Sequence, residues 1–151
     1  MYKRILVPLD GSTQAERILA HVEALAKISG AKVILLTIPE PPSVPSDIVG
    51  CPCEDDEWRD ACGRHEREAT DYLGETRGAL EEKGIAVSVC LERGPIVGTI
   101  MRVAEREDAD LVALTSHGRT ALSEVFHGSV AAGLLHRIDR PILLIRADRH
   151  S

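Results

Sequence analysis

Two glycines in the last third of the chain have the spacing of a phosphate-binding loop. Gly118 is followed, after nine residues, by Gly128 and Ser129, where a helical pattern begins. Glycine lets the backbone approach an anion because it has no Cβ, and the free N–H groups and dipole of a helix N-terminus favour negative charge. The spacing therefore predicts a loop across which a polyphosphate lies. The loop is neither a Walker loop nor a dinucleotide fingerprint, since G-x-x-x-x-G-K-[ST] and G-x-G-x-x-G do not occur.

The polar residues beside these glycines do not form an obvious catalytic set. Arg119 could pair with a phosphate, although an exposed arginine commonly needs no partner, and His117 is more often a loop-ordering imidazole than a phosphate ligand. Ser116 directly precedes His117, but adjacency in sequence does not give the geometry of a Ser–His dyad. Only Glu124, His117 and His127 are available as general bases, without a lysine clamp. The loop therefore favours binding over catalysis.

A second group of chemically active side chains lies near the middle of the chain. Cys51, Cys53, Cys62 and His65 form the pattern C-x-C-x8-C-x2-H, and helical spacing puts Cys62 and His65 on one face. Three thiolates and one imidazole would make a closed, structural Zn²⁺ site. The spacing is not that of a standard zinc finger, so core packing, exposed thiols and redox pairing remain alternatives. Cys90, within a predicted strand, is most simply a core residue.

Short aliphatic runs that alternate with helical patterns must position these groups. A run without polar alternation predicts a strand that is buried on both faces. In the first helical pattern Thr13 and Glu16 match a capping box, and a long helix is expected to end near Lys83. The segment 39–56 carries five prolines and is expected to be an irregular loop insertion rich in Pro and Cys. The predicted strands span 4–9, 32–38, 85–91, 110–115 and 141–146.

Five strands joined by helices predict an α/β fold, with an open five-stranded parallel sheet and helices on both of its faces. Ligands of such sheets bind beyond the carboxyl ends of the strands. The residues that follow strands are therefore the candidates for a site, and they include Asp10, 37–40, Gly94 and 115–129. One sheet of this size accounts for the length, so residues 1–151 are expected to form a single domain.

Several motifs match a known family in the right order and over nearly the whole chain. They are ILVPLDGS at 5–12, SHGR at 116–119, GSV at 128–130 and RPILLIR at 140–146. With these motifs the chain resembles the universal stress proteins (UspA-like). The resemblance implies the strand order 3-2-1-4-5 of the adenine nucleotide alpha hydrolase-like fold. Members of the family that bind ATP carry G-x2-G-x9-G-[ST], and Thr115 stands here in place of the first glycine of that signature.

The resemblance implies a role for each residue of the phosphate loop. Backbone amides of Gly118, Gly128 and Val130, with the Ser129 hydroxyl, would hold the phosphates of ATP, or of AMP, accompanied by Mg²⁺. The β-branched side chain of Thr115 would occupy space that the family's glycine leaves for the ribose, which would reduce the affinity or shift the pose. The alternative is a loop without a ligand, in which Gly118 only forms a turn and Gly128 only precedes the start of a helix.

The same resemblance implies that residues after the first two strands hold the nucleoside. Asp10 would accept hydrogen bonds from the ribose hydroxyls, with Pro8 and Leu9 beside it; the alternative is that Asp10 is only a turn or cap residue. Ile38 would recognise adenine through its backbone and supply an apolar wall. The expected nucleotide-binding set is Pro8, Leu9, Asp10, Ile38, Thr115, His117, Gly118, Arg119, Gly128, Ser129 and Val130.

Composition restricts the partner class. The chain has 24 acidic and 18 basic residues, a net charge of −6 and only 3% aromatic residues, which argues against nucleic acid. Its longest apolar runs are about five residues, against roughly 20 for a membrane-spanning helix, and no signal-peptide pattern opens the sequence. The chain is therefore expected in the cytoplasm, where its four cysteines would be thiols or metal ligands.

The apolar run Ile142–Ile145 is expected at a sheet edge, through which members of the family commonly form homodimers. Three functions then remain, of which the least favoured is an enzyme such as a nucleotide hydrolase or nucleotidyl transferase, because the loop offers no obvious general base with a lysine clamp. The first is a stress-response regulatory dimer that binds ATP or AMP and hydrolyses it slowly at most. The second, favoured by Thr115, is an interaction protein of the same fold that binds no nucleotide and has a zinc- or thiol-dependent loop.

Overall fold

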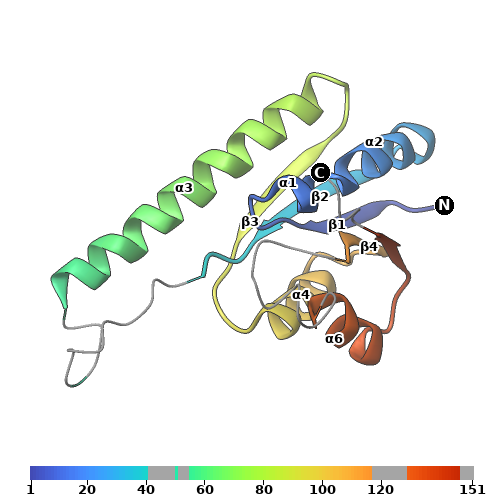
Figure 1. Cartoon of the computed structure of the whole chain (residues 1–151). Helices are drawn as coiled ribbons and strands as arrows, with labels where there is room; N and C mark the ends of the chain where they lie inside the picture. Colours follow the sequence, from blue (N-terminus) through green and yellow to red (C-terminus); the bar gives the residue numbers. More distant parts are fainter. Residues whose placement is uncertain (41–49, 51–54, 117–128, 147–151) are drawn as a thin grey trace.

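A five-stranded parallel sheet with the order β3-β2-β1-β4-β5 forms the centre of the molecule (Figure 1). The structure is a computed structural model that describes residues 1–40, 50, 55–116 and 129–146. Leu6 of β1 lies opposite Ile34 of β2 and Val112 of β4. The predicted fold class and strand order are confirmed. The strands are β1 (Arg4–Pro8), β2 (Lys32–Thr37), β3 (Val87–Leu91), β4 (Leu111–Thr115) and β5 (Ile142–Ile145).

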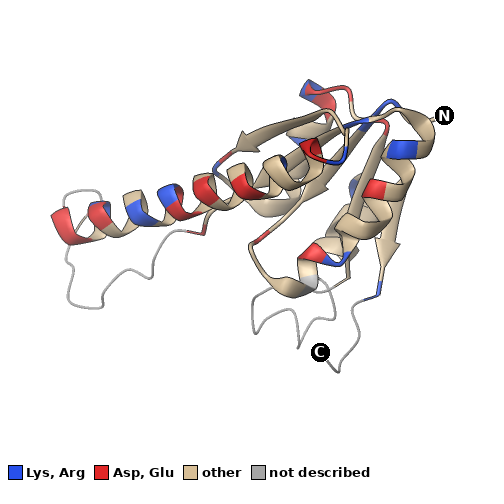
Figure 2. Cartoon of the chain, turned by 90° about the horizontal axis from the view of Figure 1, so that it is seen from above, with Lys and Arg blue, Asp and Glu red and all other residues tan. Residues whose placement is uncertain are grey.

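Helices cover both faces of this sheet, because parallel neighbours need crossover connections. One face packs against α1, α2 and α3, and the other against α4 and α6 (Figure 1). The buried residues of α3, Leu73 and Leu80, lie in its carboxyl-terminal half. The other half extends past the sheet and carries acidic and basic residues (Figure 2). The helices are α1 (Thr13–Glu16), α2 (Ile18–Ser29), α3 (Asp56–Glu81), α4 (Ile96–Arg106) and α6 (Ser129–Arg137).

The central strand shows why the predicted strands lack polar alternation. Ile5 and Val7 pack into the cluster beneath α1, α2 and α3, whereas Leu6 packs into the cluster beneath α4 and α6. All three side chains are fully buried. Burial of such an aliphatic side chain stabilises a fold by about 1.5–3 kcal/mol, so both faces of β1 contribute to the core.

The first helix begins differently from the prediction. Thr13 is the first residue of α1, and Ser12 caps the helix, because its Oγ accepts the N–H of Ala15 at 3.1 Å. The predicted capping box of Thr13 and Glu16 is therefore wrong by one position. The helix also breaks after Glu16, and α2 begins at Ile18, so one predicted helix is two.

Element ends differ from the predictions by up to two residues. The predicted third strand begins at Val87 instead of Ile85, because the N–H of Ile85 donates to Leu80 O at 3.3 Å and still closes the end of α3. Asp110 lies just outside β4, and its carboxylate accepts the N–H groups of Lys3 and Arg4 at 2.8 and 3.1 Å.

Within the described residues, no helix combines the length and apolar character needed to cross a membrane.

The contact between α4 and α6 depends on a glycine and gives a first prediction. A Cβ on Gly133 would lie 2.8 Å from Cγ2 of Val97, so Gly133→Ala is expected to destabilise the fold by about 1–3 kcal/mol. Gly74→Ala is the control, because nothing lies within 4 Å of a Cβ at Gly74 on the surface of α3. It should stabilise the fold by about 0.5–1 kcal/mol, since alanine is the better helix former. Thermal unfolding of both variants tests the pair, and a gain in Gly133→Ala equal to that in Gly74→Ala would contradict the close contact.

Candidate functional site

The carboxyl ends of β1 and β2 lie side by side and bring Asp10 to the edge of the sheet. Leu9 continues the ladder beyond β1, because its N–H donates to Leu36 O at 2.8 Å. Leu9 is buried in the core and Pro8 is half-buried, so neither offers much surface to a ligand. Asp10 comes next in the chain and is half-buried. It is therefore a carboxylate at the edge where ligands of parallel sheets bind.

A tight turn fixes the Asp10 carboxylate. Its Oδ1 accepts the N–H of Ser12 at 2.9 Å and the Ser12 hydroxyl at 2.5 Å. Gly11, between them, has a φ of +83°, a value that favours glycine. The same Ser12 hydroxyl caps α1, so the carboxylate, the turn and the helix start form one hydrogen-bonded unit. A ligand hydroxyl would thus meet an acceptor that is already oriented, which lowers the entropy cost of binding.

Two of the predicted contact residues lie on the same side of the sheet. Ile38, just past β2, and Val130, in the first turn of α6, are both half-buried and pack against the cluster beneath α4 and α6. They contact this core from different elements. An apolar wall on this face is consistent with the prediction for Ile38.

Thr115 lies on the opposite side. Along β4 the side chains alternate, with Leu111 and Ala113 in the cluster beneath α1, α2 and α3, and Val112 and Leu114 in the other cluster. Thr115 is therefore directed toward the first cluster, and its side chain is buried. Its β-branched side chain thus fills the α1 side of the sheet, not the side on which Ile38 and Val130 pack.

Part of the predicted phosphate loop lies outside the described residues. This applies to His117, Gly118, Arg119 and Gly128, whose roles stay predictions. The helix after the loop begins at Ser129, where the sequence predicts it. Because α6 follows β4 in a parallel sheet, this N-terminus lies at the same edge as Asp10.

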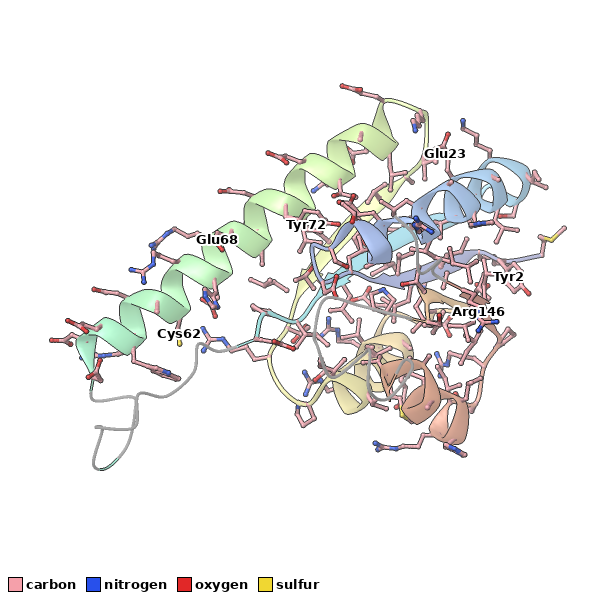
Figure 3. All side chains as sticks on the ribbon, viewed as in Figure 1. Tyr2, Glu23, Cys62, Glu68, Tyr72 and Arg146 are labelled. Atoms are coloured by element: carbon pink, nitrogen blue, oxygen red, sulfur yellow. The ribbon has the colours of Figure 1, made fainter. Side chains whose placement is uncertain are left out.

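A buried hydroxyl near Asp10 was missed by the sequence analysis. Tyr72 points from α3 toward α1 and the sheet (Figure 3), and its hydroxyl oxygen is buried without a hydrogen-bond partner among the described residues. Burial, the neighbouring Glu16 carboxylate and the charge of Asp10 raise the pKa of Tyr72 far above its ordinary value. The phenol therefore stays protonated, with the Glu16 carboxylate as an acceptor beside it. In the sequence Tyr72 stands at the helical spacing of apolar residues such as Leu73 and Leu80, a pattern that carries no signal for the environment of the hydroxyl.

Of the predicted zinc ligands, the structure describes Cys62 and His65. Both lie on α3; Cys62 is a half-buried free thiol and His65 is exposed. Nδ1 of His65 lies 2.9 Å from the carbonyl oxygen of Glu40, just past β2. Because a carbonyl only accepts, Nδ1 is the donor in this contact.

Cys51 and Cys53 lie outside the described residues, and within these residues no group of three or more His, Cys, Asp or Glu side chains could hold a metal ion. The zinc site stays a prediction. Cys90 is half-buried in β3 and packs against the cluster beneath α4 and α6. Burial raises the pKa of its thiol, and this effect outweighs the opposite effect of Arg106, whose Nη2 lies 3.7 Å from Sγ.

The fifth strand has the position that the prediction requires. It is last in the sheet and pairs with β4 alone among the described strands, with Leu144 opposite Leu114. Leu144 is 38% exposed, and the other residues of β5 are half-buried. An apolar edge strand of this kind can pair with another chain.

Comparison with known proteins agrees with this geometry. The model of the universal stress protein family matches residues 1–146. Universal stress protein MJ0577 of Methanocaldococcus jannaschii is 28% identical over 97% of this chain and 96% of its own. A universal stress protein of Thermus aquaticus is 30% identical over 97% of this chain and all of its own.

The solved structure of MJ0577 has the same architecture. It aligns with a TM-score of 0.85 at 28% identity and covers 99% of both chains. The family model spans nearly the whole sequence, and the structural match includes the sheet, its covering helices and the strand ends that carry Asp10 and Ile38. On this evidence the chain belongs to the universal stress protein family.

Proposed function

We propose that the chain binds an adenine nucleotide at the carboxyl ends of β1 and β4 and that the occupied site regulates a partner protein. The observation that carries the proposal is the Asp10 carboxylate, oriented by Ser12 at the ligand-binding edge of the sheet. Two related proteins support it: one universal stress protein was solved in complex with cAMP, and one from Archaeoglobus fulgidus with dAMP, at TM-scores of 0.64 and 0.65. They are 21% and 20% identical to this chain, so their ligands indicate a nucleotide class only.

In this proposal Asp10 accepts hydrogen bonds from the ribose, and Ile38 and Val130 line the apolar side of the site. The N-terminus of α6 at Ser129 holds phosphate through its free N–H groups and dipole. ATP accompanied by Mg²⁺ is the preferred ligand, and AMP is the alternative. No catalytic role is assigned, so hydrolysis would be slow at most.

Titration calorimetry on ligand-free protein tests the proposal, with ATP, AMP and cAMP as ligands and GTP as the control. We expect at least one adenine nucleotide to bind and GTP to bind more weakly. Absence of heat and of thermal stabilisation with all three adenine nucleotides would overturn it. The second candidate, an interaction protein without a nucleotide, would then remain, and the replacement of the signature's first glycine by Thr115 favours it.

The proposed regulatory unit is a homodimer that pairs through β5, with the cytoplasm as its expected location. Replacing Leu144 with lysine places a charge on the exposed face of this strand, and we expect it to convert a dimer into a monomer in analytical ultracentrifugation. Leu135→Lys on α6 is the control, because Leu135 is also exposed, at 59%, but lies off the strand. A monomeric wild-type protein at micromolar concentration would refute the dimer.

A further inference from the structure

A second helix N-terminus lies at the carboxyl edge of the sheet. α4 has eleven residues and begins after Gly94 and Pro95, directly beyond β3. The leading N–H groups of a helix have no intrahelical partner, and Thr99 is the residue whose N–H first donates back, to Pro95 O at 2.9 Å. The N–H groups of 96–98 therefore precede the hydrogen-bonded ladder. Pro95, the N-cap residue, has no side-chain group that could cap them.

Thr99 provides an independent sign of a ligand at this helix start. It is only 1% exposed, and its Oγ1 has no hydrogen-bond partner among the described residues. A Cβ built on Gly94 would lie 2.9 Å from this Oγ1, so the hydroxyl points back toward the start of the helix. An unpartnered buried hydroxyl costs about 1–3 kcal/mol, which a hydrogen-bonding ligand would recover.

The first turn of α4 packs against the second turn of α6. The two helices lie side by side (Figure 1), and Val97, in the first turn of α4, contacts Gly133, five residues into α6. Both helices leave carboxyl ends of parallel strands, so their N-termini lie at the same edge. Packed helix axes are about 8–10 Å apart, and the contact lies about one turn into α6, so the two positive helix ends are roughly 10 Å from each other.

Exposed arginines lie near the start of α4, and each forms an ion pair with a glutamate. Arg102 Nη2 lies 3.4 Å from the carbonyl oxygen of Arg93, the residue before Gly94, and 3.5 Å from Glu92 Oε2. Arg93 pairs with Glu66, and Arg106 pairs with Glu92 at 2.6 Å. Arg93 and Arg102 are largely exposed, so each could turn onto an anion while Arg106 continues to neutralise Glu92.

We propose that the first turn of α4 is a second phosphate subsite, formed by the N–H groups of 96–98 and the Thr99 hydroxyl. The phosphate is either the terminal group of a nucleotide whose inner phosphate lies at Ser129, or a separate phosphate ion. In the first case the subsite rests on the proposed function and explains a preference for ATP over AMP. In the second it is independent of the nucleotide.

Thr99→Val tests the subsite, because valine keeps the shape of threonine and removes the hydroxyl. Titration calorimetry with ATP, with AMP and with inorganic phosphate distinguishes the two sources. If the terminal phosphate occupies the subsite, Thr99→Val weakens ATP binding about tenfold and leaves AMP binding within about twofold. If a separate ion occupies the subsite, the same variant weakens the binding of inorganic phosphate and leaves the affinities for ATP and AMP unchanged.

Ser88→Ala is the matched control, since Ser88 Oγ in β3 is likewise buried and lacks a partner among the described residues, but lies away from the helix start. It should leave all three affinities unchanged, and neither substitution should lower the melting temperature of the ligand-free protein. The subsite is overturned if Thr99→Val binds ATP and phosphate as the wild type does, or loses ATP and AMP equally. A third outcome separates the two proposals. If the wild-type protein binds inorganic phosphate but no nucleotide, and Thr99→Val weakens the phosphate binding, the proposed function is overturned and the subsite is retained.

Discussion

Replacing Asp10 with alanine is expected to weaken ATP binding about 100-fold, because the two charge-assisted hydrogen bonds that we propose to the ribose would be lost at once. The fold should tolerate the change, since Asp10 is only half-buried and the Ser12 hydroxyl can still cap α1. Calorimetry with ATP and 2′-deoxy-ATP measures the effect. The loss should be smaller for 2′-deoxy-ATP, which has one hydroxyl fewer for the carboxylate to accept.

Two further variants separate the contact with ligand from the orientation of the carboxylate. Ser12→Ala removes the 2.5 Å hydrogen bond to Asp10 Oδ1 but leaves the charge, so it should weaken ATP by several-fold only. Asp55→Asn changes a carboxylate that caps α3 by accepting the N–H of Trp58 at 2.7 Å, and it should leave affinity unchanged. Unaltered ATP binding by Asp10→Ala would remove the ribose contact from the proposal.

Replacing Arg140 with methionine is expected to lower the free energy of unfolding by about 2–4 kcal/mol. Arg140 Nη1 donates to the carbonyl oxygens of Ala104 and Ala109 at 2.7 and 2.9 Å, and only 19% of its side chain is exposed. Both acceptors belong to buried residues between the last turn of α4 and the start of β4. Methionine keeps the aliphatic stem but removes the donor of both carbonyl groups; Ala104 O retains the N–H of Ala109 at 2.9 Å, so the cost falls mainly on Ala109 O.

Urea unfolding measures this effect, with Arg137→Met as the matched control. Arg137 is the last residue of α6 and is exposed, so its replacement should change stability by no more than about 0.5 kcal/mol. The Arg140 ion pair with Asp139 contributes little, since 80% of the Asp139 side chain is exposed. Equal stability of the two variants would show that the carbonyl groups find other donors.

The strands of the sheet could be predicted from the sequence, because a strand that is buried on both faces is a continuous run of apolar residues. The stretch Val33–Leu36 within β2 has no polar position, and such a run is visible without any knowledge of its neighbours. Element ends were less predictable, because they depend on single competing hydrogen bonds. Ser12, rather than Thr13, caps α1, and the N–H of Ile85 bonds to Leu80 O at the end of α3 instead of opening β3. Neither hydrogen bond can be predicted from hydrophobic periodicity.

The candidate site divides in a similar way. Asp10 could be located from sequence because it follows a recognisable strand, and the resemblance to the family supplied its role. Tyr72 and Thr99 could not, because their significance depends on whether a buried oxygen finds a partner across the fold. A threonine in a helical stripe has the same sequence pattern whether or not its hydroxyl is bonded. The direction of the Thr115 side chain likewise required the alternation along β4.

The common orientation of α4 and α6 directs two positive helix N-termini toward the same edge of the sheet, although the chain as a whole is negatively charged. The chain carries a net charge of −6, so an approaching polyphosphate is repelled at long range. Only within the last few ångströms do the helix ends attract it, because helix-end charges act over about one turn. Raising the ionic strength from about 10 to 150 mM shortens the screening length from about 30 to 8 Å and weakens the repulsion first. Nucleotide association should therefore become faster with added salt, the reverse of the behaviour of a basic nucleotide-binding protein.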